Sequence, residues 1–233
     1  MERRDFIRFC TATVVANGTA TAALAEDARP RLYARARLVD ETGRPLLAKA
    51  IPAERNFVFH YPYASTPCFL LNLGKPVKAS AQLRTVDDKP YQWRGGVGAR
   101  RSVVAYSAIC AHQLSYPTRD ISFISYRAEK STRNQLAAVI HCCSEHSQYD
   151  PAEGARVLAG PAPQPLATIL LEHQSATDEL YAVGTLGGEL FSEFFAKYEF
   201  KLNLEHSGAA RQAVAGSCTV QELDHCCRQQ VKC

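Results

Sequence analysis

The chain has 233 residues, of which 46% are hydrophobic and 21% charged, and this composition excludes a disordered, collagen-like or coiled-coil protein. Its length suffices for one substantial hydrophobic core or two small ones. The formal net charge of +4 comes without a stretch rich in lysine and arginine, so we expect no nucleic-acid partner. The nine cysteines are the unusual feature, and they predict disulfides, a metal site or both.

Residues 1–25 carry the three parts of an export signal. Arg3 and Arg4 give a basic start, a weakly apolar stretch follows over 9–24, and Ala23-Leu24-Ala25 matches a cleavage site. The paired arginines followed by Phe-Ile-Arg resemble a twin-arginine signal, which exports folded proteins and predicts a periplasmic location. The alternatives are an uncleaved membrane anchor, for which the stretch is short, and a basic leader without a targeting role.

Residues 26–100 predict a β-rich base, because short apolar or alternating runs over 31–39, 56–61 and 68–73 are separated by turn residues. We expect further strands over 102–109, 136–140, 167–172 and 179–183, and a loop or short helix over 187–198. Many short strands with frequent turns predict an all-β fold, either a sandwich or a small barrel. Residues 207–217 are small and polar and predict a linker, after which 218–233 form a tail with four cysteines.

Two short motifs follow apolar strand-forming runs, Cys110-Ala111-His112 and Cys143-Ser144-Glu145-His146. Each motif supplies one thiolate and one imidazole, so two loops at the ends of strands would offer a Cys₂His₂ set. Tetrahedral zinc uses such a set. A [2Fe–2S] cluster with two Cys on one iron and two His on the other uses it as well. Zinc fingers usually pair Cys with Cys and His with His, so the mixed pairing favours the iron–sulfur cluster.

The motifs are followed by Ser147, Tyr149 and the segment Gly160-Pro161-Ala162-Pro163. With these elements in this order, the sequence resembles the Rieske iron–sulfur proteins, particularly those of quinol:cytochrome c reductases and the small subunits of arsenite oxidases. The resemblance covers about residues 100–172. It implies a β-sandwich base domain with an inserted cluster-binding domain over 101–172, and base strands with a short helix over 173–206.

The resemblance also implies the roles of individual residues. Cys110 and Cys143 would bind one iron of a single [2Fe–2S] cluster, and His112 and His146 would bind the other. The loop over 160–163 would cover the cluster. Hydrogen bonds to cluster sulfurs raise the reduction potential, and Ser147 and Tyr149 are the candidate donors. Only Cys143 has the C-x-x-H spacing, so we expect Cys142 to point away, as a free thiol or half of a disulfide.

Some features depart from the family. Quinol-oxidising members carry a disulfide between the two cluster loops, whereas Ser115 and Glu145 occupy those positions here. The connection between the two motifs is long and predicts a surface insertion over 118–134. A tail metal site with His225 is the weaker alternative to disulfides in the tail. Six cysteines are available for disulfides: Cys68, Cys142, Cys218, Cys226, Cys227 and Cys233.

The resemblance implies an exported protein that passes single electrons from quinol or a larger dehydrogenase to a c-type cytochrome. It would act as a subunit of an oxidoreductase complex rather than as a stand-alone enzyme, associated with the membrane through its N-terminus or through its partner. The first alternative is the relay subunit of a molybdenum oxidase such as arsenite oxidase. The second is a zinc-stabilised binding domain without a redox role.

Overall fold

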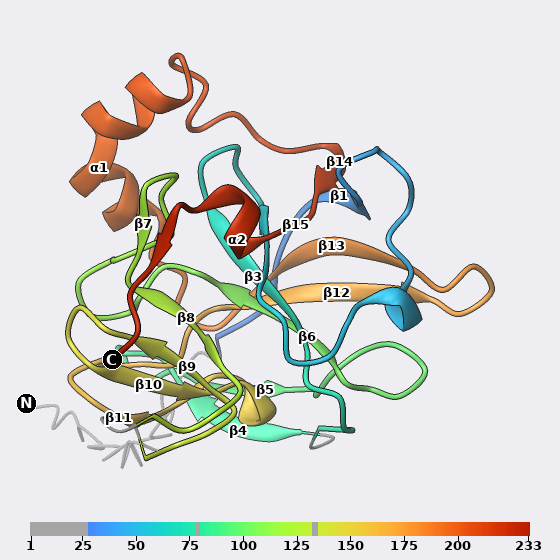
Figure 1. The fold of residues 1–233 in the computed structure, drawn as a ribbon, viewed down its shortest axis with the longest axis horizontal. Helices are drawn as coiled ribbons and strands as arrows, with labels where there is room; N and C mark the ends of the chain where they lie inside the picture. The colour runs from blue at the N-terminus through green and yellow to red at the C-terminus, as the bar shows by residue number, and fades with distance from the viewer. Residues whose placement is uncertain (1–27, 78–79, 132–134) are drawn as a thin grey trace, which may run out of the picture.

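The structure, a computed structural model, describes residues 28–77, 80–131 and 135–233. The expected export signal over 1–25 lies outside these residues. Most of the elements are strands, which confirms the predicted all-β class. The described strands form an eight-stranded sheet, a four-stranded sheet and two small two-stranded sheets (Figure 1). None of the helices in the described part of the chain is both long and apolar enough to cross a membrane.

The eight-stranded sheet is the base of the molecule. Most of its neighbouring strands are antiparallel, and β1 pairs with β14 in parallel. Its strands are, in spatial order, β14 (Gly216–Thr219), β1 (Arg31–Val39), β13 (Glu179–Leu186), β12 (Thr168–Gln174), β6 (Val103–Ser107), β3 (Pro67–Asn72), β2 (Phe57–His60) and β15 (Gln221–Glu222).

Strand β3 shows why the middle of this sheet is apolar on both faces. Phe69 and Leu71 belong to one buried cluster, whereas Cys68 and Leu70 belong to another. Successive side chains of a strand point to opposite faces, so the sheet is buried on both sides here. A continuous apolar run, rather than an alternating one, is therefore what this position requires.

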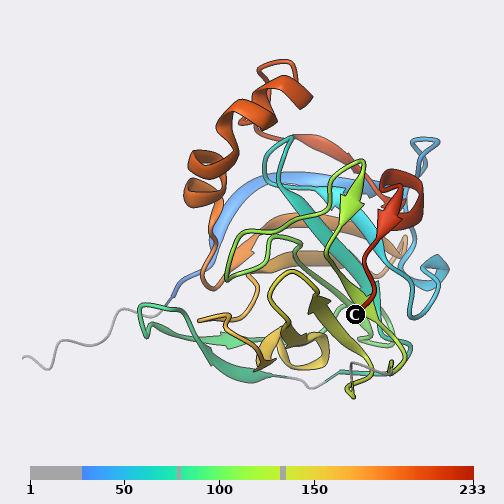
Figure 2. The same ribbon diagram turned by 60° about the vertical axis from the view of Figure 1, so that its left-hand side comes forward.

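The four-stranded sheet packs against the first of these two clusters. Ile140 and Tyr149 from this sheet are fully buried together with Phe69 and Tyr106 from the base sheet. Figures 1 and 2 show the small sheet lying beside the base, with the C-terminus next to it. Its strands are, in spatial order, β11 (Arg156–Ala159), β10 (Ser147–Asp150), β9 (Val139–Cys142) and β8 (Ile124–Arg127).

The small sheet is inserted between two adjacent strands of the base sheet. β6 and β12 are neighbours in the base, and the chain between them, 108–167, contains all four strands of the small sheet. The expected cluster-binding domain over 101–172 therefore begins with β6 and ends within β12, which are both strands of the base sheet. The first predicted motif begins three residues after the end of β6, and the second begins at the residue after β9.

The segment 118–134, expected to be a surface insertion, contributes part of the core, because Ile124 and Tyr126 of β8 are buried there. The same segment contains β7 (Ile121–Ser122). A two-stranded sheet of β4 (Ala81–Arg84) and β5 (Pro90–Trp93) contributes Trp93 to this core.

The C-terminal part is more ordered than the predicted linker and tail. Helix α1 (Phe191–Glu205) is longer than the expected short helix, and Phe194 packs on Tyr116 with ring centres 4.9 Å apart. After it, β14 and β15 extend the base sheet. Helix α2 (Leu223–Cys226) follows, and β16 (Gln229–Gln230) pairs with β7. Two short 3₁₀ turns lie at Ala48–Ala50 and Pro151–Glu153.

Candidate metal centre

The alternation of β9 decides where the two adjacent cysteines point. Ile140 and Cys142 face the core that they share with Cys110, and all three side chains are fully buried. His141 points to the opposite face, where its imidazole nitrogens lie 3.5 and 3.6 Å from Cys233 Sγ. Cys143 is on the same side as His141 and forms a disulfide with Cys233, with a Cα–Cα distance of 5.7 Å.

This arrangement reverses the expectation for the two cysteines. The motif spacing predicted Cys143 as the partner of Cys110 and predicted that Cys142 points away. In the structure Cys142 lies beside Cys110, and Cys143 is oxidised in the disulfide. The physical reason is the position of β9, whose inward-facing residues are even-numbered over 140–142.

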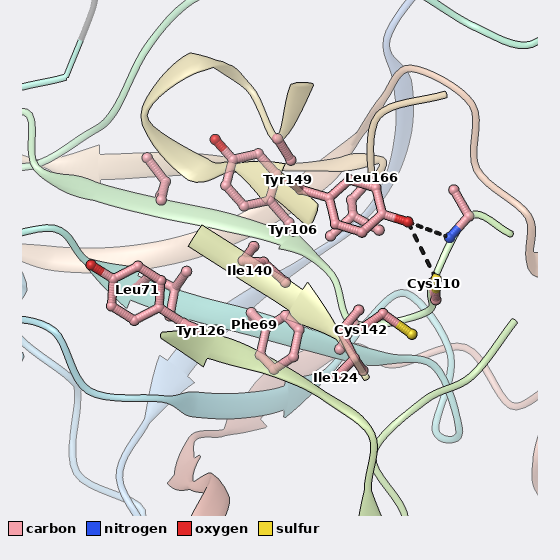
Figure 3. Close-up of a cluster of buried hydrophobic side chains, with 14 of the residues drawn as sticks. Phe69, Leu71, Tyr106, Cys110, Ile124, Tyr126, Ile140, Cys142, Tyr149 and Leu166 are labelled. Carbon is pink, nitrogen blue, oxygen red and sulfur yellow. Dashed lines mark hydrogen bonds between the residues drawn. The ribbon is translucent and has the colours of Figure 1, made fainter. Parts of the chain in front are cut away.

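The thiols of Cys110 and Cys142 form the centre of the site. Figure 3 shows the two cysteines near one another at the edge of the buried cluster, with the sulfur of Cys110 joined to the hydroxyl of Tyr149. Each sulfur also accepts hydrogen bonds from backbone amides of the residues two and three positions further along the chain. These residues are His112 and Gln113 for Cys110, and Ser144 and Glu145 for Cys142. The two loops therefore surround their sulfurs with backbone amides at the same positions relative to the cysteine.

The pair stabilises one thiolate. Hydrogen bonding from Cys142, assisted by Tyr149 and the two amides, lowers the pKa of the Cys110 thiol against the opposing effect of burial. The hydrogen bond to Cys110, together with burial and the charge at Cys110, raises the pKa of Cys142. The proton of the Cys142 thiol thus lies in a hydrogen bond to the sulfur of Cys110. A metal ion can replace it, because metal ligands must be deprotonated.

Tyr149 is the third member of this centre. Its hydroxyl lies 3.3 Å from Cys110 Sγ and accepts a hydrogen bond of 3.1 Å from the amide of Ala111 (Figure 3). Burial, and then the charge at Cys110, raise the pKa of Tyr149, so the phenol keeps its proton. The hydroxyl can therefore donate to the sulfur, which is the geometry that its predicted role requires.

Two further predicted residues have buried polar atoms without partners. Among the described residues, Nδ1 of His112 and Oγ of Ser147 are both enclosed and make no hydrogen bond. Leaving such an atom unpaired costs free energy, typically about 1–3 kcal/mol. Both atoms therefore have unused capacity to bind a ligand or a hydrogen-bond partner.

His146 lies apart from this centre. It is exposed, has a positive φ of 58°, and its ring centre is 5.9 Å from that of His141. The ligand atoms of His141, His146 and Cys233 all lie within 4.8 Å of one another, the one such group of three within the described part of the chain. The structure thus gathers Cys110, Cys142 and Tyr149 on one face of β9, and His146 with His141 and the disulfide on the other. When the C-x-x-H spacing of the second motif is counted from Cys142 instead of Cys143, the fourth position is Glu145.

The proline-containing segment lies directly against the second motif. Gly160 has a φ of 87°, and a Cβ at this position would lie 2.5 Å from the Cα of Ser147 and 2.6 Å from the carbonyl oxygen of His146. Only glycine allows so close an approach with this backbone conformation. The segment goes on through Pro161, Ala162 and Pro163, of which Ala162 is buried in the core that contains Cys110 and Cys142.

The remaining cysteines do not form the expected tail disulfides. Within the described residues Cys143–Cys233 is the one disulfide, and Cys68, Cys218, Cys226 and Cys227 are free thiols. His225, the candidate ligand of a tail metal site, lies 3.5 Å from a carboxylate oxygen of Glu41. The sequence alone predicts that Cys142 points away from the site and that His141 is a strand residue, and it leaves Cys233 as only one of six cysteines available for a disulfide. The alternation of β9 is the signal that separates Cys142 from His141.

No protein-family model matches the chain. A solved structure that matches is the soluble domain of the Rieske protein II (soxF) from Sulfolobus acidocaldarius. The match has a TM-score of 0.45 and 24% sequence identity, and it covers 68% of this chain and 82% of that chain.

Proposed function

We propose that the protein transfers single electrons through a [2Fe–2S] cluster bound between the loops that follow β6 and β9. The observation that carries this proposal is the buried pair of sulfurs, Cys110 and Cys142, each surrounded by backbone amides. Thiolates are the ligands that bind iron in such clusters, and amide hydrogen bonds to the sulfurs tune the potential.

The available side chains fit a cluster in which one iron is bound by thiolates and the other by different ligands. Cys110 and Cys142 would hold the buried iron, and His112, with its unpartnered Nδ1, would bind the outer iron. Glu145 would supply the fourth ligand, because it stands three residues after Cys142, the spacing of the second motif. It would replace the expected His146, whose imidazole lies near the imidazole of His141 and the sulfur of Cys233 instead. Carboxylates bind iron together with imidazoles in other proteins.

When bound, the cluster would take up and give away one electron at a time. The phenol of Tyr149 holds its proton and donates to the sulfur of Cys110, which favours the more negative reduced state. The carboxylate of Glu145 adds negative charge at the outer end and disfavours that state. The core around Cys110 and Cys142 excludes water from the inner end.

We also propose that the protein works in the periplasm, with quinol or a larger dehydrogenase as electron donor and a c-type cytochrome as acceptor. The twin-arginine-like N-terminus supports this location. The disulfide Cys143–Cys233 supports it as well, because disulfides persist in oxidising compartments. The location is tested by expressing the full chain and looking for the protein in the periplasmic fraction, from which it should be lost when Arg3 and Arg4 are changed to Lys.

The cluster itself is tested on the full chain purified without oxygen. We expect iron and acid-labile sulfide in equal amounts, about two of each per chain, and a low-temperature EPR signal that appears on reduction with dithionite. A preparation that contains stoichiometric zinc, no sulfide and no EPR signal would contradict the proposal.

A further inference from the structure

The face of β9 opposite Cys142 gathers a second set of metal-binding groups. Cys233 Sγ lies 3.5 Å from Nε2 of His141, and the ligand atoms of His141, His146 and Cys233 are all within 4.8 Å of one another. Cys143 is joined to Cys233 by the disulfide. Two sulfurs and two imidazoles therefore meet at one place, on the side of the strand that the proposed cluster does not use.

We propose that reduction of this disulfide creates a zinc site in which Cys143, Cys233, His141 and His146 bind one Zn²⁺. Two thiolates and two imidazoles are a common tetrahedral set for zinc, with metal–ligand distances of about 2.0–2.3 Å. Ligand atoms around such an ion lie about 3.3–3.8 Å apart. Cys233 Sγ and Nε2 of His141 already lie 3.5 Å apart, and the set with His146 lies within 4.8 Å. To complete the site, the two sulfurs must separate after reduction and the imidazole of His146 must move closer.

Cys233 is held in place by backbone contacts as well as by its sulfur. Strand β16 pairs with β7, and the amide of Val231 donates to the carbonyl oxygen of Ser122 at 2.9 Å. The guanidinium of Arg127 donates to the carbonyl oxygen of Val231. The hydroxyl of Ser131 donates to the carbonyl oxygen of Cys233 at 3.0 Å. The tail therefore stays beside β8 and β9 when the disulfide is broken.

Two of the other three ligands, Cys143 and His141, are held by the small sheet. The amide of Cys143 donates to the carbonyl oxygen of Phe123 at 2.6 Å. His141 belongs to β9 and is 2% exposed, so its imidazole cannot turn to solvent. His146 is the exposed member and leaves the set open on one side, through which the ion can enter.

The chemistry balances with a dithiol as reductant. The dithiol gives two electrons and two protons to the Cys143–Cys233 bond, which breaks into two thiols, and the dithiol becomes a disulfide. Zinc then displaces the two thiol protons, which are released to solvent, and binds two thiolates and two neutral imidazoles. The oxidised protein offers two imidazoles and no thiolate, so the disulfide and the zinc-bound form exclude each other.

The test uses the full chain with Cys110→Ser and Cys142→Ser, which removes the thiols of the proposed cluster and keeps those of the zinc site. The protein is reduced with dithiothreitol, freed of it without oxygen, and titrated with Zn²⁺ against a chromophoric chelator. We expect one zinc per chain, bound at least roughly 100-fold more tightly than by the oxidised protein. A further change, Cys233→Ser, should remove the tight binding, whereas Cys226→Ser should leave it intact. Equal zinc affinity of the oxidised and reduced proteins would overturn the proposal, and so would tight binding that survives Cys233→Ser.

A second measurement guards against variants that fail to fold. In the reduced chain without substitutions, zinc should protect Cys143 and Cys233 from alkylation, while Cys226 and Cys227 react at unchanged rates, as peptide mass spectrometry would show. Equal alkylation of Cys143 and Cys233 with and without zinc would also refute the site. The result is separate from the cluster, because an EPR-silent chain could still pass both zinc tests and an EPR-active one could fail them.

Discussion

His141 and Cys142 are neighbours in β9, yet their side chains lie on opposite faces of that strand. Cys142 joins Cys110 in the core, and His141 joins Cys233 under the C-terminal tail. In a strand, a shift by one residue moves every side chain to the other face. Adjacent residues can therefore serve two chemically different places, and the two cysteines at 142 and 143 do so here.

Exchanging either cysteine for serine distinguishes their roles. Cys142→Ser removes one of the paired sulfurs, so we expect loss of most of the iron and of the EPR signal. Cys143→Ser removes only the disulfide to Cys233, so the iron and the signal should remain. Iron analysis and EPR of both purified proteins check this. The opposite pattern would restore Cys143 as the ligand, as the motif spacing alone predicts.

The fourth ligand is tested by Glu145→His. An imidazole in place of a carboxylate removes one negative charge from the cluster, and this change stabilises the reduced state relative to the oxidised one. Replacing thiolates by histidines raises potentials by hundreds of millivolts, so one charge should raise the midpoint by on the order of 100 mV. Redox titration followed by EPR measures it. His146→Gln is the matched control, and a larger shift in that variant than in Glu145→His would assign the ligand to His146 instead.

The sequence predicts those parts of the site that depend on short-range spacing. Cys110 and His112 lie two residues apart in one short loop, so they must be close to each other. Tyr149 lies in β10, the strand that follows the second motif, so its place beside that motif also depends on nearby residues only. The choice between Cys142 and Cys143 depends on the residue at which β9 ends, and strand ends are poorly defined by sequence patterns. Cys233 is 90 residues from Cys143, and nothing local marks it as the partner.

The same distinction applies to the fold. Some strands are recognisable in the sequence as continuous apolar runs, because residues on both of their faces are buried. These are β3, β6, β12 and β13. β14, β15 and β16 are short and largely polar, and they are strands because the base sheet and β7 offer them unpaired edges. Their existence depends on tertiary pairing, which a polar stretch does not reveal.

Tyr149→Phe tests the hydrogen bond to the sulfur of Cys110. The phenol is 3.3 Å from that sulfur and stays protonated, so its removal should disfavour the reduced state. If about 1 kcal/mol of hydrogen-bond energy is specific to the reduced state, the midpoint falls by about 40–50 mV. Protein-film voltammetry or redox titration measures the shift. Tyr198→Phe, on α1 and away from the site, should leave the potential unchanged, and an unchanged potential in Tyr149→Phe would remove this role from Tyr149.

His60 makes the stability of the fold depend on pH without any metal. Burial in the base, and then the neighbouring His206 with its ring centre 6.2 Å away, lower the pKa of His60 to about 4 from the model-peptide value of 6.5. Between these two pH values the unfolded chain binds a proton that the folded chain does not. The free energy of unfolding therefore falls as the pH is lowered through this window, by up to about 3 kcal/mol from this residue. Denaturant unfolding at pH 7.5 and 4.5 should show a smaller loss of stability for His60→Gln than for the unchanged chain. An equal loss in the two proteins would show that other groups cause the acid sensitivity.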